Sequence, residues 1–260
     1  MLESGILLAS AVIAGILGGL LGIGGGVVIM PVLRFLFGIS TPFAAGTTVL
    51  AVFFTSLSGG YKHFKLGHVD IKSLGPIMLA GAISTTLFSF IFLMIARRPL
   101  WLEFGVGCVF LFIAVRMLGE GILGVKQKQE LNNNSISARR VTKLCVGFIS
   151  GMFPGLFGIG TGAILVPAFN YCLNSPIKVA IGSSLICFAA NAFISSIFKF
   201  LQGYMLLDKA IILCAGTTIG AYAGARLNKG FPPRLLKLLF GLTFLYVSLK
   251  YICLLWGIKI

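Results

Sequence analysis

The chain carries the run Gly22-Ile23-Gly24-Gly25-Gly26, followed by Val27-Val28-Ile29-Met30-Pro31, in the middle of a long uncharged stretch. Glycine at this density does not hold a regular helix, because it adds backbone freedom and contributes no packing. A helix broken inside a membrane leaves N–H and C=O groups without partners, and these are tolerated only where protein or a wet cavity receives them. The run therefore predicts a broken helix that lines a substrate site. No lysine or serine follows it as in a P-loop, so phosphate-cradle chemistry is not indicated.

The same pattern returns 136 residues later as Gly158-Ile159-Gly160-Thr161-Gly162, with Pro167 in the place of Pro31. Two more matches have the same spacing: Gly46-Thr47-Thr48 with Gly182-Ser183-Ser184, and Gly67 with Gly203. These matches indicate an internal duplication, which is common in secondary transporters. We predict a membrane repeat at residues 1–125, a hydrophilic linker at 126–140 and a second membrane repeat at 141–260.

The composition indicates a membrane protein, because 58% of the 260 residues are hydrophobic and only 10% are charged, against about 25% charged in soluble domains. We predict an all-α polytopic protein with about eight hydrophobic segments in two pseudo-symmetric repeats, the first helix of each being broken by glycine. The expected segments are 5–37, 42–60, 73–96, 100–125, 141–173, 176–200, 208–228 and 232–257, with a loop at 61–72. Gly216, Gly220 and Gly224 recur every four residues, which is typical of close helix packing in lipid.

The formal net charge of +15 has two readings. Basic loops follow from positive-inside topology and anionic headgroups, so membrane lipids are expected partners; the charge also attracts an anionic substrate. Nucleic-acid binding is not indicated, since the basic residues are spread over short loops. The six cysteines form no CxxC pair, so we predict no disulfide framework, metal site or cofactor. Assembly into a homo-oligomer is left open.

These residues resemble the TauE/SafE sulfite exporter family. The resemblance rests on the two glycine breaks with Pro31 and Pro167, the length, the two four-segment repeats, the central linker, and Gly67-His68-Val69-Asp70. It implies a multi-pass permease of the cell inner membrane for sulfite, sulfonates, sulfoacetate or related small anions, without ATP hydrolysis. The chain departs from the family pattern at three positions, and these departures leave the substrate open: Thr161 replaces the central glycine of the second run, and Thr85 and Ser89 stand where glycines are usual.

The candidate substrate-binding residues are of three kinds, and each has a purely structural alternative. The breaks either pack helices tightly or expose half-helix N-termini whose dipole and free N–H groups attract anions. The repeated hydroxyls either contact substrate or bond back to their own helix, and the lone amide either bridges two helices or faces the cavity. The candidates are Gly24, Gly25, Gly26, Gly160, Thr161 and Gly162 in the breaks, the hydroxyls of Thr47, Thr48, Ser183 and Ser184, and the amide of Asn191.

The charged residues near helix ends have more ordinary predicted roles. Lys62, His63 and Lys199 are expected to extend to the headgroups, and Lys199 lies 136 residues after His63. Arg116 is expected to pair with Glu120, one helical turn away.

Two rival functions are an intramembrane enzyme and a non-transporting membrane scaffold. An enzyme would need a nucleophile with a base or paired acids within the membrane, and only Glu103 and Glu120 fall inside an apolar segment. We therefore predict a transporter and not an enzyme.

The topology has two alternatives. If each broken segment crosses the membrane once, each half has four crossings and the repeats are parallel. If it is re-entrant, each half has three crossings and the repeats are inverted. The distribution of Lys and Arg does not separate these alternatives. We favour inversion, because inverted repeats place two half-helix ends at a shared site near the midplane.

Overall fold

A computed structural model describes residues 2–123, 136, 138–160, 162–227 and 233–255, and the described residues contain helices and no strand. Six of these helices are long and apolar enough to cross a membrane. The predicted all-α polytopic class is therefore confirmed, whereas the count of eight segments and the division into two repeats stay predictions. The elements are α1 (Leu2–Leu21), α2 (Gly26–Pro31), η1 (Val32–Leu36), α3 (Thr41–Lys65), α4 (Ile71–Ala96), α5 (Pro99–Leu123), α6 (Arg140–Phe157), α7 (Gly162–Pro167), η2 (Ala168–Cys172), α8 (Ile177–Leu201), α9 (Leu207–Leu227) and α10 (Pro233–Leu255).

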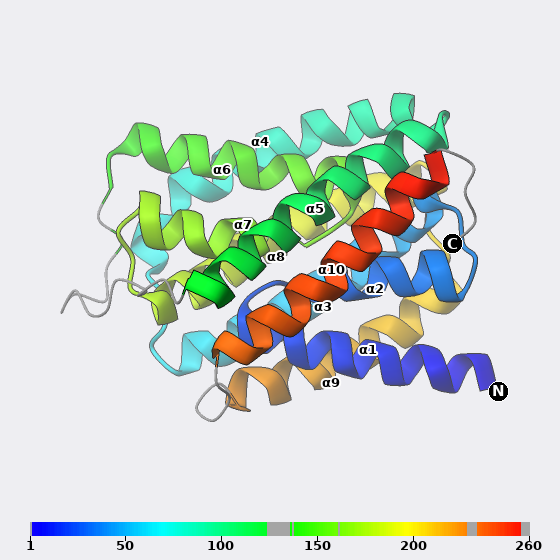
Figure 1. Cartoon of the computed structure of the whole chain (residues 1–260). Coiled ribbons are helices and arrows are strands. Elements are labelled where there is room, and N and C mark those ends of the chain that lie inside the picture. The colour runs from blue at the N-terminus through cyan, green and yellow to red at the C-terminus, as the bar shows by residue number, and fades with distance from the viewer. Residues whose placement is uncertain (1, 124–135, 137, 161, 228–232, 256–260) are drawn as a thin grey trace.

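The chain reverses direction at the first glycine break. Gly22, Gly24 and Gly25 have φ angles of +73°, +80° and +70°, a region that glycine reaches without steric cost. A Cβ on Gly25 would lie 3.0 Å from the carbonyl oxygen of Ala14, although a straight helix would separate these residues by about 16 Å. Accordingly, α2 and η1 return toward the N-terminal end of the bundle (Figure 1).

The second break has the same form, because η2 packs against α6 and Gly158 has a φ of +63°. In Figure 1, α6 starts at the opposite end of the bundle from α1. Both segments thus reverse direction as the re-entrant alternative requires, although α1 alone is long enough to span a membrane, and the topology stays a prediction. After its proline, each returning segment widens into a π-helical turn: the Phe37 N–H donates to the Val32 oxygen and the Leu173 N–H to the Ala168 oxygen, both at 3.2 Å.

The helices of one half find their partners in the other half. α1 packs along α9 and α6 packs along α4, while α3 packs on α8 and α5 on α10. Close contact depends on glycine: a Cβ on Gly15 would lie 2.8 Å from the Thr217 Cα, and a Cβ on Gly151 would overlap the Gly81 oxygen. The predicted small-residue face of α9 is confirmed, since Gly216, Gly220 and Gly224 all lie against α1. Each of these four pairs joins a helix of the first predicted repeat to a helix of the second.

One predicted boundary is wrong. Residues 61–65 were expected in a loop, but α3 continues through them to Lys65. Long basic side chains can continue a helix to the membrane edge, because their stems cover apolar surface while their charges reach outward. The reversal comes at Gly67, whose φ is +73°, and at the equivalent Gly203 after α8, whose φ is +76°.

Candidate functional site

The two glycine breaks touch each other backbone to backbone in the interior. A Cβ on Gly26 would lie 2.9 Å from the Gly160 nitrogen, and a Cβ on Gly162 would overlap the Gly22 oxygen. These glycines are buried, as are Gly24 and Gly25. The structure thus brings together the predicted break residues that it describes; Thr161 lies outside the described residues. Tight packing is present, and it places the starts of α2 and α7 at one location.

Two hydroxyl-bearing residues of α3, Thr48 and Ser56, lie beside the first break. The Thr48 Cγ2 is 3.2 Å from the Cβ position of Gly26, and the Ser56 Oγ is 3.2 Å from that of Gly24. Both hydroxyl oxygens are buried and have no hydrogen-bond partner within the described structure. Buried polar groups normally have partners, so these two are available to a ligand. Ser56 was not a predicted site residue; its signal was its position two turns of helix after Thr48.

Helix α8 presents an aromatic ring to the same glycines. Phe188 is fully buried, and its Cε1 lies 2.6 Å from the Cβ position of Gly24 and 3.5 Å from that of Gly160. Helix α3 thus brings two hydroxyl-bearing residues and the apolar Val52 to the breaks, whereas α8 brings the ring of Phe188.

The other three predicted hydroxyls have structural partners. The Leu206 N–H donates to the Thr47 Oγ1 at 3.1 Å, and the Asp70 N–H donates to the Ser183 Oγ at 3.2 Å. Each bond holds the segment that leads into α9 or α4. Ser184 donates to the Ile181 oxygen of its own helix at 2.9 Å, which is the back-bonding alternative.

Asn191 bridges two helices, the first of its two predicted roles. Its Nδ2 donates to the Ser150 Oγ of α6 at 3.2 Å, while its Oδ1 is buried without a partner in the described part of the chain. The amide also lies 2.7 Å from the Cβ position of Gly81 on α4. Asn191 therefore ties α8 to both members of the α4–α6 pair.

The prediction that Lys199 and His63 extend to the headgroups is wrong, because both side chains are fully buried. The Lys199 Nζ donates to the Gly155 oxygen at 2.7 Å and lies 2.9 Å from the centroid of the Phe92 ring. The His63 Nε2 lies 3.3 Å from the Gly19 oxygen. Glycine leaves each carbonyl accessible from the neighbouring helix, so the basic group bonds inward. Sequence spacing alone did not reveal which helix would lie beside it.

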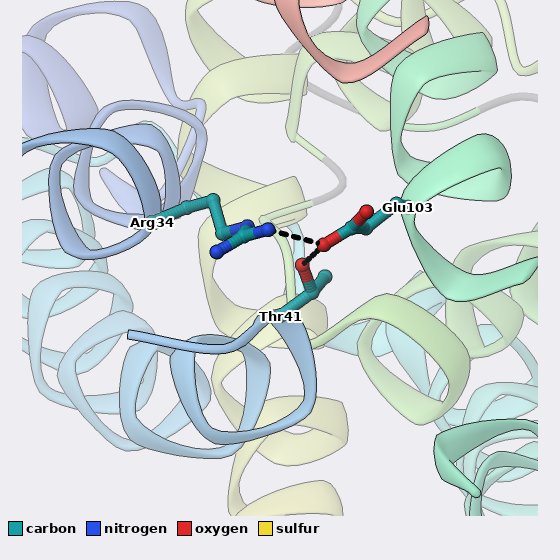
Figure 2. Close-up of polar contacts among 3 residues, drawn as sticks. All are labelled: Arg34, Thr41 and Glu103. Atoms are coloured by element: carbon teal, nitrogen blue, oxygen red, sulfur yellow. Dashed lines mark hydrogen bonds and ion pairs between the residues drawn. The ribbon is translucent and has the colours of Figure 1, made fainter. Parts of the chain in front are cut away.

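An ion pair that sequence reasoning missed joins three elements of the first half. Figure 2 shows Glu103 of α5 accepting from Arg34 of η1 at 2.7 Å and from Thr41 of α3 at 2.9 Å. Charged residues within apolar segments are costly and usually paired, and that signal was available. The predicted pair of Arg116 with Glu120 on α5 is confirmed.

Comparisons with known proteins agree with this architecture. The family model described as "Sulfite exporter TauE/SafE" matches residues 7–251. The chain is 26% identical to the probable membrane transporter protein YunE of Bacillus subtilis over 95% of this chain and 96% of the relative. It is 29% identical to YdhB of the same organism over 86% and 89% of the two chains, and 28% identical to a probable membrane transporter protein of Haemophilus influenzae over 92% and 94%. No solved structure matches the chain significantly. With a family match across nearly its whole length, the chain belongs to the sulfite exporter TauE/SafE family of membrane transporters.

Proposed function

We propose that this protein is a secondary transporter that moves a small anion, such as sulfite or a short sulfonate, across the cell inner membrane. The anion binds where the two glycine breaks meet. The observation that carries the proposal is the pair of buried, unpartnered hydroxyls of Thr48 and Ser56 beside that meeting point. The family's description as a sulfite exporter supports the substrate class.

The helix ends support an anionic ligand. α2 with η1 and α7 with η2 each form a short helical run that starts at a break. A helix start carries roughly half a positive charge, and two such starts lie at the same place. Neutral donors suit a carrier, because binding must be strong enough for the anion to enter and weak enough for it to leave.

The arrangement also supports alternating access. Each re-entrant segment belongs to one half, whereas α1 and α6 pack on helices of the other half. Movement of the two re-entrant segments relative to these interlocked helices would open the site to one side of the membrane at a time.

The rival functions have less support. Two acids within the described membrane helices, Glu103 and Glu120, are each paired with an arginine, so neither serves as a free catalytic base. The other two, Glu3 and Asp208, lie in the first turns of α1 and α9. A scaffold would have no need for unpartnered buried hydroxyls at its centre, since each costs free energy when buried.

The proposal is tested by a flux screen with purified protein in proteoliposomes. The anions are sulfite, thiosulfate, methanesulfonate, sulfoacetate and acetate, and we expect saturable flux of at least one sulfur oxyanion. No flux for any of them would overturn the proposal, and turnover of a substrate without flux would favour an enzyme.

The location of the site is tested by Thr48→Val, which keeps the shape and removes the hydroxyl. We expect the KM of the transported anion to rise by about fivefold to tenfold, the effect of losing roughly one good hydrogen bond. The matched control is Ser184→Ala at the equivalent position of α8, where the hydroxyl bonds its own helix; its KM should stay at the wild-type value. Valine at Gly25 or Gly160 is a poorer test, because a side chain there meets backbone atoms and would prevent folding.

A further inference from the structure

Two basic side chains in equivalent positions cover the carbonyl ends of the helices that precede the breaks. Lys199 of α8 donates to the Gly155 oxygen of α6, and His63 of α3 contacts the Gly19 oxygen of α1. Each glycine stands three residues before the first glycine of its break. Lys199 and His63 are 136 residues apart, as are the two glycines. The same contact between a basic side chain and a glycine carbonyl is therefore present in both halves.

The charge of these carbonyl ends affects the binding of an anion at the breaks. The last four C=O groups of a helix have no partner within the helix, and together they carry roughly half a negative charge. α1 ends at Leu21 and α6 at Phe157, so both negative ends adjoin the place where α2 and α7 begin. Left uncovered, they would offset the positive helix starts and repel an anion.

The role that we consider for Lys199 goes beyond cancelling the partial negative charge at the C-terminal end of α6. An ammonium carries a whole positive charge, about twice the opposing charge of the helix end. The side chain is 0% exposed, and no ion pair joins it to any carboxylate that the structure describes. The Phe92 ring excludes water from one side of the ammonium. With its proton held, Lys199 would carry a local excess of positive charge that is screened little and acts over a longer range.

We propose that Lys199 and His63 set the preference of the transport site for anions by covering the carbonyl ends of α6 and α1, with Lys199 contributing the larger share. The proposal rests on the proposed function and deepens it. Both are positioning residues that act through the helix ends, without contact to the substrate.

The test separates the charge of Lys199 from its hydrogen bond. Lys199→Gln keeps an N–H donor for the Gly155 oxygen and removes the charge, while Lys199→Arg keeps both. The matched control is Lys209→Met, which removes a partly exposed lysine near the same end of the molecule. The KM and maximal rate for sulfite are measured in proteoliposomes, and the rise in melting temperature with sodium sulfite over sodium gluconate is measured in detergent.

We expect Lys199→Gln to raise the KM for sulfite by about tenfold and to reduce the sulfite-specific rise in melting temperature. Lys199→Arg and Lys209→Met should stay within about twofold of the wild-type KM. A purely structural cap would lower the melting temperature of the sulfite-free protein and leave the KM unchanged, which would overturn the proposal. If Lys199→Gln does not fold, Lys199→His, which copies the first half, serves instead; an unchanged KM again overturns the proposal.

The two proposals fail in different ways. If the wild-type protein transports sulfite and the charge-removing variants retain its KM, the transport function stands and the role of Lys199 is wrong. If the wild-type protein neither transports nor is stabilised by sulfite, thiosulfate, methanesulfonate or sulfoacetate, both proposals are wrong.

Discussion

Helices α3 and α8 occupy equivalent places in the two halves, yet they carry different chemistry. At the breaks, α3 presents the hydroxyls of Thr48 and Ser56, whereas α8 presents the ring of Phe188. Near their last turns, α3 carries a histidine and α8 a lysine, each at a glycine carbonyl. The backbone requirements are thus shared by the halves and the ligand-facing groups are not. The anion site proposed at the breaks would therefore have two different walls.

The largest expected effect falls on a feature that both helices share. A Cβ on Gly46 would overlap the Tyr204 oxygen, and a Cβ on Gly182 would overlap the His68 oxygen. Because backbone atoms cannot move aside cheaply, we expect Gly46→Ala and Gly182→Ala each to destabilise the protein by about 3 kcal/mol. The measurement is the melting temperature in detergent and the yield of folded protein. Gly75→Ala in α4 is the control, since a Cβ there meets nothing within 4 Å.

If only one of the two alanine variants lost stability, the halves would differ in their backbone as well as in their side chains. The equivalence of α3 and α8 would then not extend to the segments that follow them.

An intermediate effect on stability is expected at the ion pair of Arg34 with Glu103 in the first half. Glu103→Gln leaves Arg34 without a charged partner in a largely buried place. Breaking a buried pair costs about 3–5 kcal/mol, and the partial exposure of Arg34 reduces this, so we expect about 2 kcal/mol. Asn170 stands in the position equivalent to Arg34 and donates to the Ser175 oxygen within its own half.

Asn170→Ala is therefore the comparison, with an expected loss of about 1 kcal/mol. Both variants are followed by thermal unfolding in detergent. Equal losses would show that the ion pair adds nothing beyond an ordinary buried hydrogen bond.

The smallest effect concerns the hydroxyls that hold the segments before α4 and α9. Thr47→Val and Ser183→Ala each remove the acceptor of one backbone N–H, at a cost of about 1 kcal/mol. We expect equal losses of melting temperature and an unchanged KM for the transported anion. A raised KM in either variant would move the substrate site toward that hydroxyl and away from Thr48.

The sequence predicted the helical class, the glycine breaks and the close-packed face of α9, because glycine and proline positions report backbone geometry directly. It did not predict the burial of Lys199, since burial depends on which helix lies beside it. It missed the contact of Arg34 with Glu103, because these residues are 69 positions apart and no local pattern joins them. The spacing of the four repeated hydroxyls could not distinguish Thr48 from the other three. Thr47 and Ser183 accept bonds from segments that the fold places beside them, and Ser184 bonds its own helix.

The pairing of α1 with α9 has a consequence for biosynthesis. Because synthesis runs from the N-terminus, α1 meets its packing partner α9 only after the helices between them have been made, and until then the glycine face of α1 is open to lipid. α4 likewise waits for α6. The helices of the two halves are therefore interlocked, and α1 and α4 complete their packing only when α9 and α6 have been made.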